Sequence, residues 1–244
     1  MQPATKTYAV HASVLSGVSC HRLWSAWADP ELLQQWFCDH AWGEIQLGGN
    51  YYWKFNEFDV QVHLRITELI PEVRMTLDSQ GGSVEFRLEA EGHGSRMSVK
   101  QQWPAEQAPP SEALADVRSG WLMSMALMRH YAENYFEQSK QTLMVRRPWP
   151  GSFAKVLPFY QDPRELKRWL KVSERPREIL ADTGQEVCYR WDPAGGVLEC
   201  KAFHWAGAQE LALRVTSWST DYDISLLKPQ LEESLDQLQS LLIS

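Results

Sequence analysis

The chain of 244 residues carries 24 Lys and Arg against 31 Asp and Glu, which gives a formal net charge of -7, and 44% of its residues are hydrophobic. The basic residues form no run, so a phosphate backbone would be repelled and nucleic acid is excluded as the expected partner. No apolar stretch is long enough to span a membrane, no secretory signal is visible, and the four cysteines form no CxxC pair, which together favour a cytoplasmic protein with no membrane partner, no metal and no cofactor.

Apolar and polar residues alternate along much of the first 100 residues. The alternation runs through residues 8–14, 51–55, 60–66, 73–77, 84–90 and 97–99. Glycines at 48–49, 81–82 and 92–94 lie between several of these runs, and glycine supplies the positive φ angles that tight hairpins require. The pattern predicts a meandering antiparallel sheet with one buried face and one solvated face.

Two short helices are expected near the start, and a long helix is expected after the sheet. Residues 19–27 and 30–37 have helical apolar spacing, and Asp29 followed by Pro30 is typical of a helix start. The long helix, from about residue 111 to 138, carries one apolar face: Leu114, Val117, Trp121, Met125, Met128, Tyr131 and Tyr135. Gly120 inside this helix predicts a close approach of its backbone to a neighbouring element.

The second half repeats motifs of the first half in the same order. Residues 28–37 (ADPELLQQWF) return at 161–170 as QDPRELKRWL, and residues 53–55 return at 189–191. Residues 81–86 (GGSVEF) return at 195–200 as GGVLEC, at an offset that is 22 residues shorter than that of the preceding match. This difference is about two strands with their turns, so the second copy should lack the hairpin of residues 60–77.

These motifs predict an α+β fold of two tandem domains, each a sheet followed by a long C-terminal helix. The first domain, residues 1–139, should be complete, and the second, residues 140–244, should be truncated. Within the second domain, residues 139–150 are interpreted as a link, and the final helix should bury an apolar face that runs from residue 227 to 242.

Taken together, the motifs resemble the family of activator of heat-shock-protein-90 ATPase homologues, within the START-like (SRPBCC) helix-grip superfamily. The resemblance covers about residues 5–138 and rests on short motifs in order: Asp29-Pro30, Trp36-Phe37, Gly48-Gly49 before Tyr51-Tyr52-Trp53, and Gly120-Trp121. It implies a curved antiparallel sheet that grips the long helix, with a cavity between them. The second copy resembles a degenerate member.

The candidate ligand-binding residues are those expected to line this cavity. They are Trp36, Phe37, Trp53, Phe55, Phe86, Trp121, Met125 and Met128. Aromatic and Met side chains can bind apolar ligands of varied shape, although the same residues would also serve as an ordinary core. The first hypothesis for function is therefore the binding of a small apolar or amphipathic molecule, without catalysis. Asp39 and His40 are candidate polar contacts, with a solvated loop as the alternative.

Two other functions stay open. A protein-interaction or co-chaperone-like role would use an edge or an apolar patch of the truncated second domain. A cyclase- or hydrolase-type enzyme would depend on Asp39, His40 and Glu44, but the sequence has no zinc-protease motif, no nucleophile elbow and no nucleotide-binding glycine loop. No catalytic residue is therefore assigned, and His63, on the polar phase of its strand, is expected at the surface.

Overall fold

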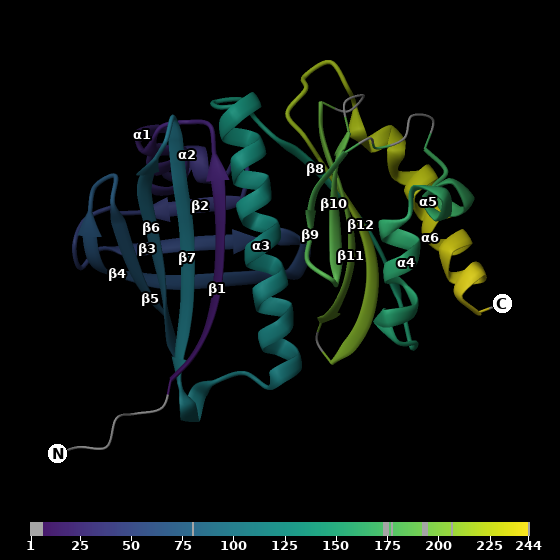
Figure 1. The fold of residues 1–244 in the computed structure, drawn as a ribbon, viewed down its shortest axis with the longest axis horizontal. Coiled ribbons are helices and arrows are strands. Elements are labelled where there is room, and N and C mark those ends of the chain that lie inside the picture. Colours follow the sequence, from purple (N-terminus) through teal and green to yellow (C-terminus); the bar gives the residue numbers. More distant parts are fainter. Residues whose placement is uncertain are drawn as a thin grey trace. The chain divides into compact units, whose positions relative to one another are not determined.

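The computed structural model of the chain describes residues 7–79, 81–172, 176, 178–191, 195–205 and 207–243. Gln80, in the predicted turn at 79–82, lies outside the described residues. The chain divides into two compact units, Met1–Glu137 and Gln138–Ser244. Each unit holds one antiparallel sheet and a helix that follows this sheet in the sequence (Figure 1). The predicted α+β class and the tandem arrangement are therefore confirmed.

The first unit contains a seven-stranded antiparallel sheet with the order β1-β7-β6-β5-β4-β3-β2. Consecutive strands from β2 to β7 are neighbours, as expected of the predicted meander, and β1 pairs with β7. The strands are β1 (Thr7–Ser16), β2 (His40–Gly43), β3 (Asn50–Phe55), β4 (Val60–Ile70), β5 (Arg74–Ser79), β6 (Gly82–Glu91) and β7 (Gly94–Pro104). The alternative of a solvated loop at Asp39 and His40 is wrong for His40, which begins the edge strand β2 and pairs with Lys54 of β3, whereas Asp39 lies in a bend before the strand.

The strands of this sheet have one buried face and one solvated face, as predicted. In β3, Tyr51 and Trp53 are 0% and 4% exposed, whereas Tyr52 between them is only half-buried. His63 lies on the solvated phase of β4 and is exposed, as predicted. This alternation follows from the period of two of an extended strand, which directs successive side chains to opposite faces.

Three α-helices belong to this unit: α1 (Cys20–Ala28), α2 (Pro30–Leu33) and α3 (Ser111–Asn134), with short 3-10 helices η1 (Asn56–Phe58) and η2 (Ala105–Gln107). The carboxylate of Asp29 accepts the backbone N–H groups of Glu31 and Leu32 at 2.8 and 3.4 Å, and it caps α2 as predicted. The helix ends at Leu33 and not at residue 37, because the chain tightens there into bonds to the third preceding residue.

The prediction for Gly120 is wrong. This glycine lies inside α3, but a Cβ atom placed on it would meet no atom of a neighbouring element within 4 Å. The helix therefore tolerates glycine here without needing it for close packing. The middle of α3 is nonetheless deeply buried, and Trp121, Met125 and Met128 are 8%, 1% and 0% exposed.

The second unit contains a five-stranded sheet with the order β8-β12-β11-β10-β9. Its strands are β8 (Gln141–Pro148), β9 (Glu178–Asp182), β10 (Glu186–Trp191), β11 (Gly196–Trp205) and β12 (Ala208–Ser217). Its helices are α4 (Leu157–Gln161), α5 (Pro163–Trp169) and α6 (Lys228–Ile243), with the 3-10 helices η3 (Phe153–Lys155) and η5 (Ile224–Leu227). The interpretation of residues 139–150 as a link is wrong, because residues 141–148 form β8.

Among its described residues, the second unit has no counterpart of the β4–β5 hairpin, as predicted. Strand β10 corresponds to β3, and β11 and β12 correspond to β6 and β7, so β4 and β5 have no counterpart among the described residues. Strand β8 pairs with β12 as β1 pairs with β7. The indole of Trp36 donates to the carbonyl oxygen of Ala26 at 2.8 Å, and Trp169 donates to Phe159 at 2.9 Å, ten residues back in both copies.

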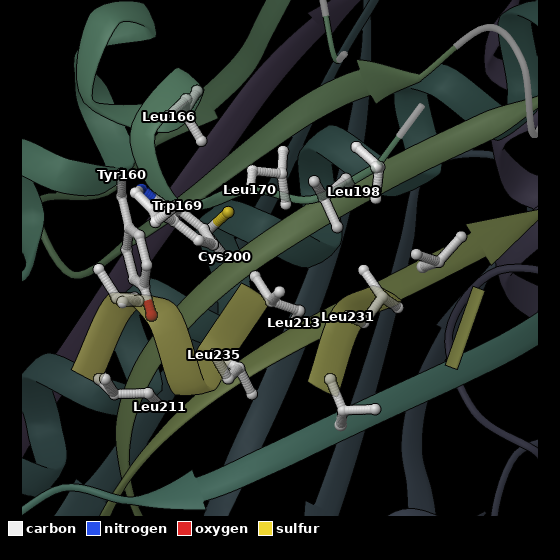
Figure 2. Close-up of a cluster of buried hydrophobic side chains, with 14 of the residues drawn as sticks. Tyr160, Leu166, Trp169, Leu170, Leu198, Cys200, Leu211, Leu213, Leu231 and Leu235 are labelled. Atoms are coloured by element: carbon white, nitrogen blue, oxygen red, sulfur yellow. The ribbon is translucent and has the colours of Figure 1, made fainter. Parts of the chain in front are cut away.

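The core of the second unit combines leucines with aromatic rings, and Figure 2 shows Tyr160 and Trp169 among them. Tyr160 of α4 and Trp169 of α5 are both 0% exposed, and their ring centroids lie 5.9 Å apart. The apolar face of α6 is buried completely through Leu231, Leu235 and Leu238. These side chains cover one face of the sheet, as predicted for the closing helix of a copy.

Candidate functional site

The aromatic candidate residues lie together in the first unit. Phe37 is central among them, with its ring centroid 5.1 Å from that of Trp53, 5.4 Å from Phe55 and 5.9 Å from Trp121. Trp121 also meets Phe86 edge to face at 5.7 Å. The sheet, the turn after α2 and the helix α3 thus all contribute rings to one cluster, which we call the ring network: Trp27, Trp36, Phe37, Trp53, Phe55, Phe86 and Trp121.

Trp27 is the member of the ring network that sequence reasoning did not assign to the site. Its ring stacks on Phe86 with centroids 3.3 Å apart, and it also contacts the rings of Trp36, Phe37, Trp53 and Trp121. Trp27 is 2% exposed, and its indole N–H finds no acceptor among the described residues. The available signal was its position on α1, one helical turn after Leu23, which places it on the buried face.

Hydrogen bonds fix the orientation of two of these indoles. Trp36 donates to the carbonyl oxygen of Ala26, and Trp121 donates to the side-chain oxygen of Gln101 on β7 at 2.7 Å. The second bond ties α3 to the sheet. Met125 and Met128 follow on the same helix and are buried, as expected of residues that face the interior.

A small hollow lies beside two members of the ring network. It has a volume of about 10 Å³ and is lined by Leu23, Trp24, Trp27, Phe86, Leu88 and Met97. Such a volume is about what a single water molecule requires. A ligand of several heavy atoms can bind in this hollow only if some of these side chains move.

Asp39 and His40 lie near the beginning of β2, and both contact Asn56. One carboxylate oxygen of Asp39 accepts the backbone N–H of Asn56 at 2.6 Å, which anchors the turn after β3. His40 is exposed on the solvated face, because the next residue, Ala41, is the one that is buried. Glu44 is exposed as well, and its carboxylate accepts the amide of Gln46 at 2.8 Å. These groups do not converge on the ring network.

Tyr51 is a buried titratable group beside the ring network, with its ring centroid 5.9 Å from that of Trp53. Burial raises the pKa of its hydroxyl well above the usual value of 10.0, and the nearby Cys38 and Asp29 raise the pKa further. The hydroxyl donates to the carbonyl oxygen of Trp27 at 3.4 Å. Tyr51 therefore stays a neutral donor that supports α1, and it does not act as an acid or a base near neutral pH.

Among the described residues, no group of three or more His, Cys, Asp or Glu side chains is arranged to hold a metal ion. No helix in the described part of the chain combines the length and the apolar character needed to cross a bilayer.

A charged cluster on the sheet of the second unit was not predicted. Lys201 lies between Glu186 and Glu199, and Arg214 pairs with Glu199 from the neighbouring strand. Burial alone would raise the pKa of Glu199, but Arg214 and Lys201 outweigh it and hold this pKa below the usual value. Burial would lower the pKa of Lys201, but Glu186 and Glu199 raise it. Glu199 and Lys201 therefore stay charged near neutral pH, as members of an ion-pair network do.

The family match found for this chain lies within the first unit. Residues 18–133 match the family described as Activator of Hsp90 ATPase homolog 1-like protein. None of the curated proteins matches the chain.

Several solved structures are similar to this chain at low identity. DynU16, from the dynemicin biosynthetic locus, is 16% identical, with 97% of this chain and 93% of that chain covered and a TM-score of 0.48. The Aha1 dimer of Colwellia psychrerythraea is 13% identical, with 52% and 96% covered and a TM-score of 0.46. CalU16 of Micromonospora echinospora is 22% identical, with 53% and 87% covered and a TM-score of 0.41.

Proposed function

Because the first unit belongs to the family of Activator of Hsp90 ATPase homolog 1-like proteins, we propose that it binds a small apolar or amphipathic molecule between its sheet and α3, without catalysis. The ring network is the observation that carries this proposal. Its members come from α1, the turn after α2, the sheet and α3, and their mutual contacts make one continuous aromatic surface inside the unit. A ligand with an apolar body would find ring faces and edges on several sides.

Binding requires that rings move aside, and the energetics allow this. A contact between two aromatic rings contributes about 0.5–1.5 kcal/mol beyond the area that it buries. An apolar ligand that separates two rings replaces this contact by contacts of the same kind to itself. Phe37 and Phe55 are the members best placed to move, because both are only half-buried whereas Trp27 and Trp36 are 2% and 1% exposed.

A thermal-shift screen of the full chain against fatty acids and aromatic metabolites tests this proposal. A ligand at about 100 times its Kd should stabilise the first unit by about 2.7 kcal/mol. Phe37→Ala should enlarge the space among the rings and strengthen the binding of the smaller apolar compounds. Phe159→Ala is the matched control, because Phe159 is a partly buried ring packed against the core of the second unit. If no compound of the library raises the Tm of either the wild type or Phe37→Ala, the result would count against the proposal.

Protein interaction is a second candidate function, and exposed apolar side chains on sheet edges support it. In the second unit, β9 is an edge strand, and its Ile179 is 43% exposed. In the first unit, the edge strand β2 carries Trp42, which is 41% exposed and stacks on Tyr52 at 5.2 Å. A chaperone-like partner would bind such an edge by pairing or by apolar contact. Capture of a purified partner by the wild type but not by Ile179→Lys would support this role, and equal capture would refute the use of β9.

A further inference from the structure

A second hollow lies on the first unit, away from the ring network. It has a volume of about 330 Å³ and lies where the β5–β6 turn, the end of β7 and the start of β1 meet. Small-molecule sites in proteins have volumes of roughly 300–1,000 Å³, so this hollow is large enough for a small ligand. None of the candidate residues from the sequence lines it.

Two glycines bring the backbone close to residues that line this hollow. A Cβ atom on Gly82 would lie 2.6 Å from the carbonyl oxygen of Gln102 and 2.8 Å from the Trp103 ring. Gly81 has a φ of +98°, which other residues rarely adopt, and a Cβ atom there would lie 3.0 Å from the side-chain oxygen of Gln107. The backbone of the turn thus lies directly against the Trp103 ring on one side and beside the Gln107 amide on the other.

The polar groups of the hollow have hydrogen-bonding capacity to spare. Thr7, Ser83, Gln102 and Gln107 line it, and within the described part of the chain their side chains form no hydrogen bond with other protein groups. Hydroxyl and amide groups offer both donors and acceptors. Asp78 adds a carboxylate, which only accepts, and one of its oxygens receives the hydroxyl of Thr67 at 3.4 Å.

The charge of the hollow selects against anions. Among the described residues, its lining contains the carboxylate of Asp78 but no Lys, Arg or His side chain. A phosphate or carboxylate ligand would meet a like charge without a compensating cation from these residues, which is unfavourable. Trp103 is 8% exposed and gives the hollow an apolar surface among polar groups.

We propose that this hollow binds a neutral polyhydroxylated ring such as a monosaccharide unit. Ring hydroxyls would donate to the Asp78 carboxylate and exchange hydrogen bonds with the amides of Gln102 and Gln107. The less polar C–H face of the ring would lie against the Trp103 indole. The hollow shares no residue with the ring network, so this proposal can be tested independently of apolar ligand binding.

Titration of the full chain with methyl glycosides of glucose, galactose, mannose and N-acetylglucosamine tests the proposal. The signal is the indole N–H resonance of Trp103 in ¹⁵N-edited NMR spectra, assigned by its loss in Trp103→Phe. At least one glycoside should shift this resonance saturably, whereas sodium phosphate and sodium acetate at the same concentrations should not. Asp78→Asn and Gln102→Leu should each raise the Kd about tenfold or more, because the first replaces a charged acceptor by a weaker neutral one and the second removes the amide.

Glu106→Gln is the matched control, because Glu106 is an exposed neighbour of Gln107 that does not line the hollow. It should leave the Kd unchanged, and all three variants should unfold at the wild-type temperature within the error of the measurement. The proposal is overturned if no glycoside binds saturably, if phosphate or acetate binds in preference, or if Asp78→Asn and Gln102→Leu both bind as the wild type does.

Discussion

Replacement of Trp27 by Ala should destabilise the first unit more than any other single change in the ring network. Truncation of a buried aromatic residue to Ala costs about 3–5 kcal/mol when the surroundings relax only partly. Trp27 is 2% exposed, so almost the whole transfer term applies. It also contacts the rings of five other residues, which places the expected loss at about 4–5 kcal/mol. For a unit of this size, such a loss lowers the Tm by about 10–20 °C.

The assay is urea unfolding followed by circular dichroism, combined with hydrogen-exchange mass spectrometry. Exchange assigns the loss of protection to peptides of one unit or the other, so the effect of Trp27→Ala should appear only in peptides of residues 7–134. Trp169→Ala, at a fully buried indole of the second unit, is the matched control and should affect peptides of residues 141–243. A loss below about 1 kcal/mol for Trp27→Ala would refute the reasoning, because it would mean that the rings around Trp27 are not closely packed.

Three further predictions concern the charged cluster and the helix starts. Lys201→Met should cost about 3–5 kcal/mol in chemical denaturation, because it leaves Glu186 and Glu199 buried with fewer compensating cations. The folded pKa of Glu199 lies below its unfolded value near 4.5, so its stabilisation is complete above this pH and is lost as the pH falls through the folded pKa. Unfolding curves between pH 3 and 6 should therefore show an acid loss that is smaller in Glu199→Gln. Asp29→Ala and Asp162→Ala should each cost about 1 kcal/mol in the same denaturation assay, because both carboxylates cap a helix.

Strands could be predicted from the sequence wherever a long strand has one solvated face and one buried face. Strands β1 and β3 to β7 were visible for this reason. The edge strands β2 and β9 were not, because four or five residues give too few alternations to recognise. Strand β8 was interpreted as a link, since Leu143, Met144 and Val145 are consecutive apolar residues that break the alternation, and its pairing with β12 needs knowledge of the tertiary structure.

The candidate site could be predicted only in part. Rings on the buried phase of strands and on the apolar face of α3 were identified from periodicity, but their contacts depend on rotamers and register. The volume left between them, about 10 Å³ in the described hollow, could not be derived from residue types. The charged cluster could not be predicted either, because its contacts also depend on strand register. Glu199 and Arg214 face each other only through the register of β11 and β12, and charges at alternate strand positions usually indicate a solvated face.

The two copies differ at two positions of the ring network. Both copies keep the aspartate cap, the Pro start and the indole that donates ten residues back, so the framework that holds α2 and α5 is shared. Trp53 and Phe55 also have aromatic counterparts, Tyr189 and Trp191. At the repeat offsets, however, Phe37 corresponds to Leu170 and Phe86 to Cys200, and both replacements are fully buried in the second core. An aliphatic or thiol side chain at these positions packs as core but offers no ring face to a ligand. Phe37 and Phe86 are therefore the rings that distinguish the first copy from the second.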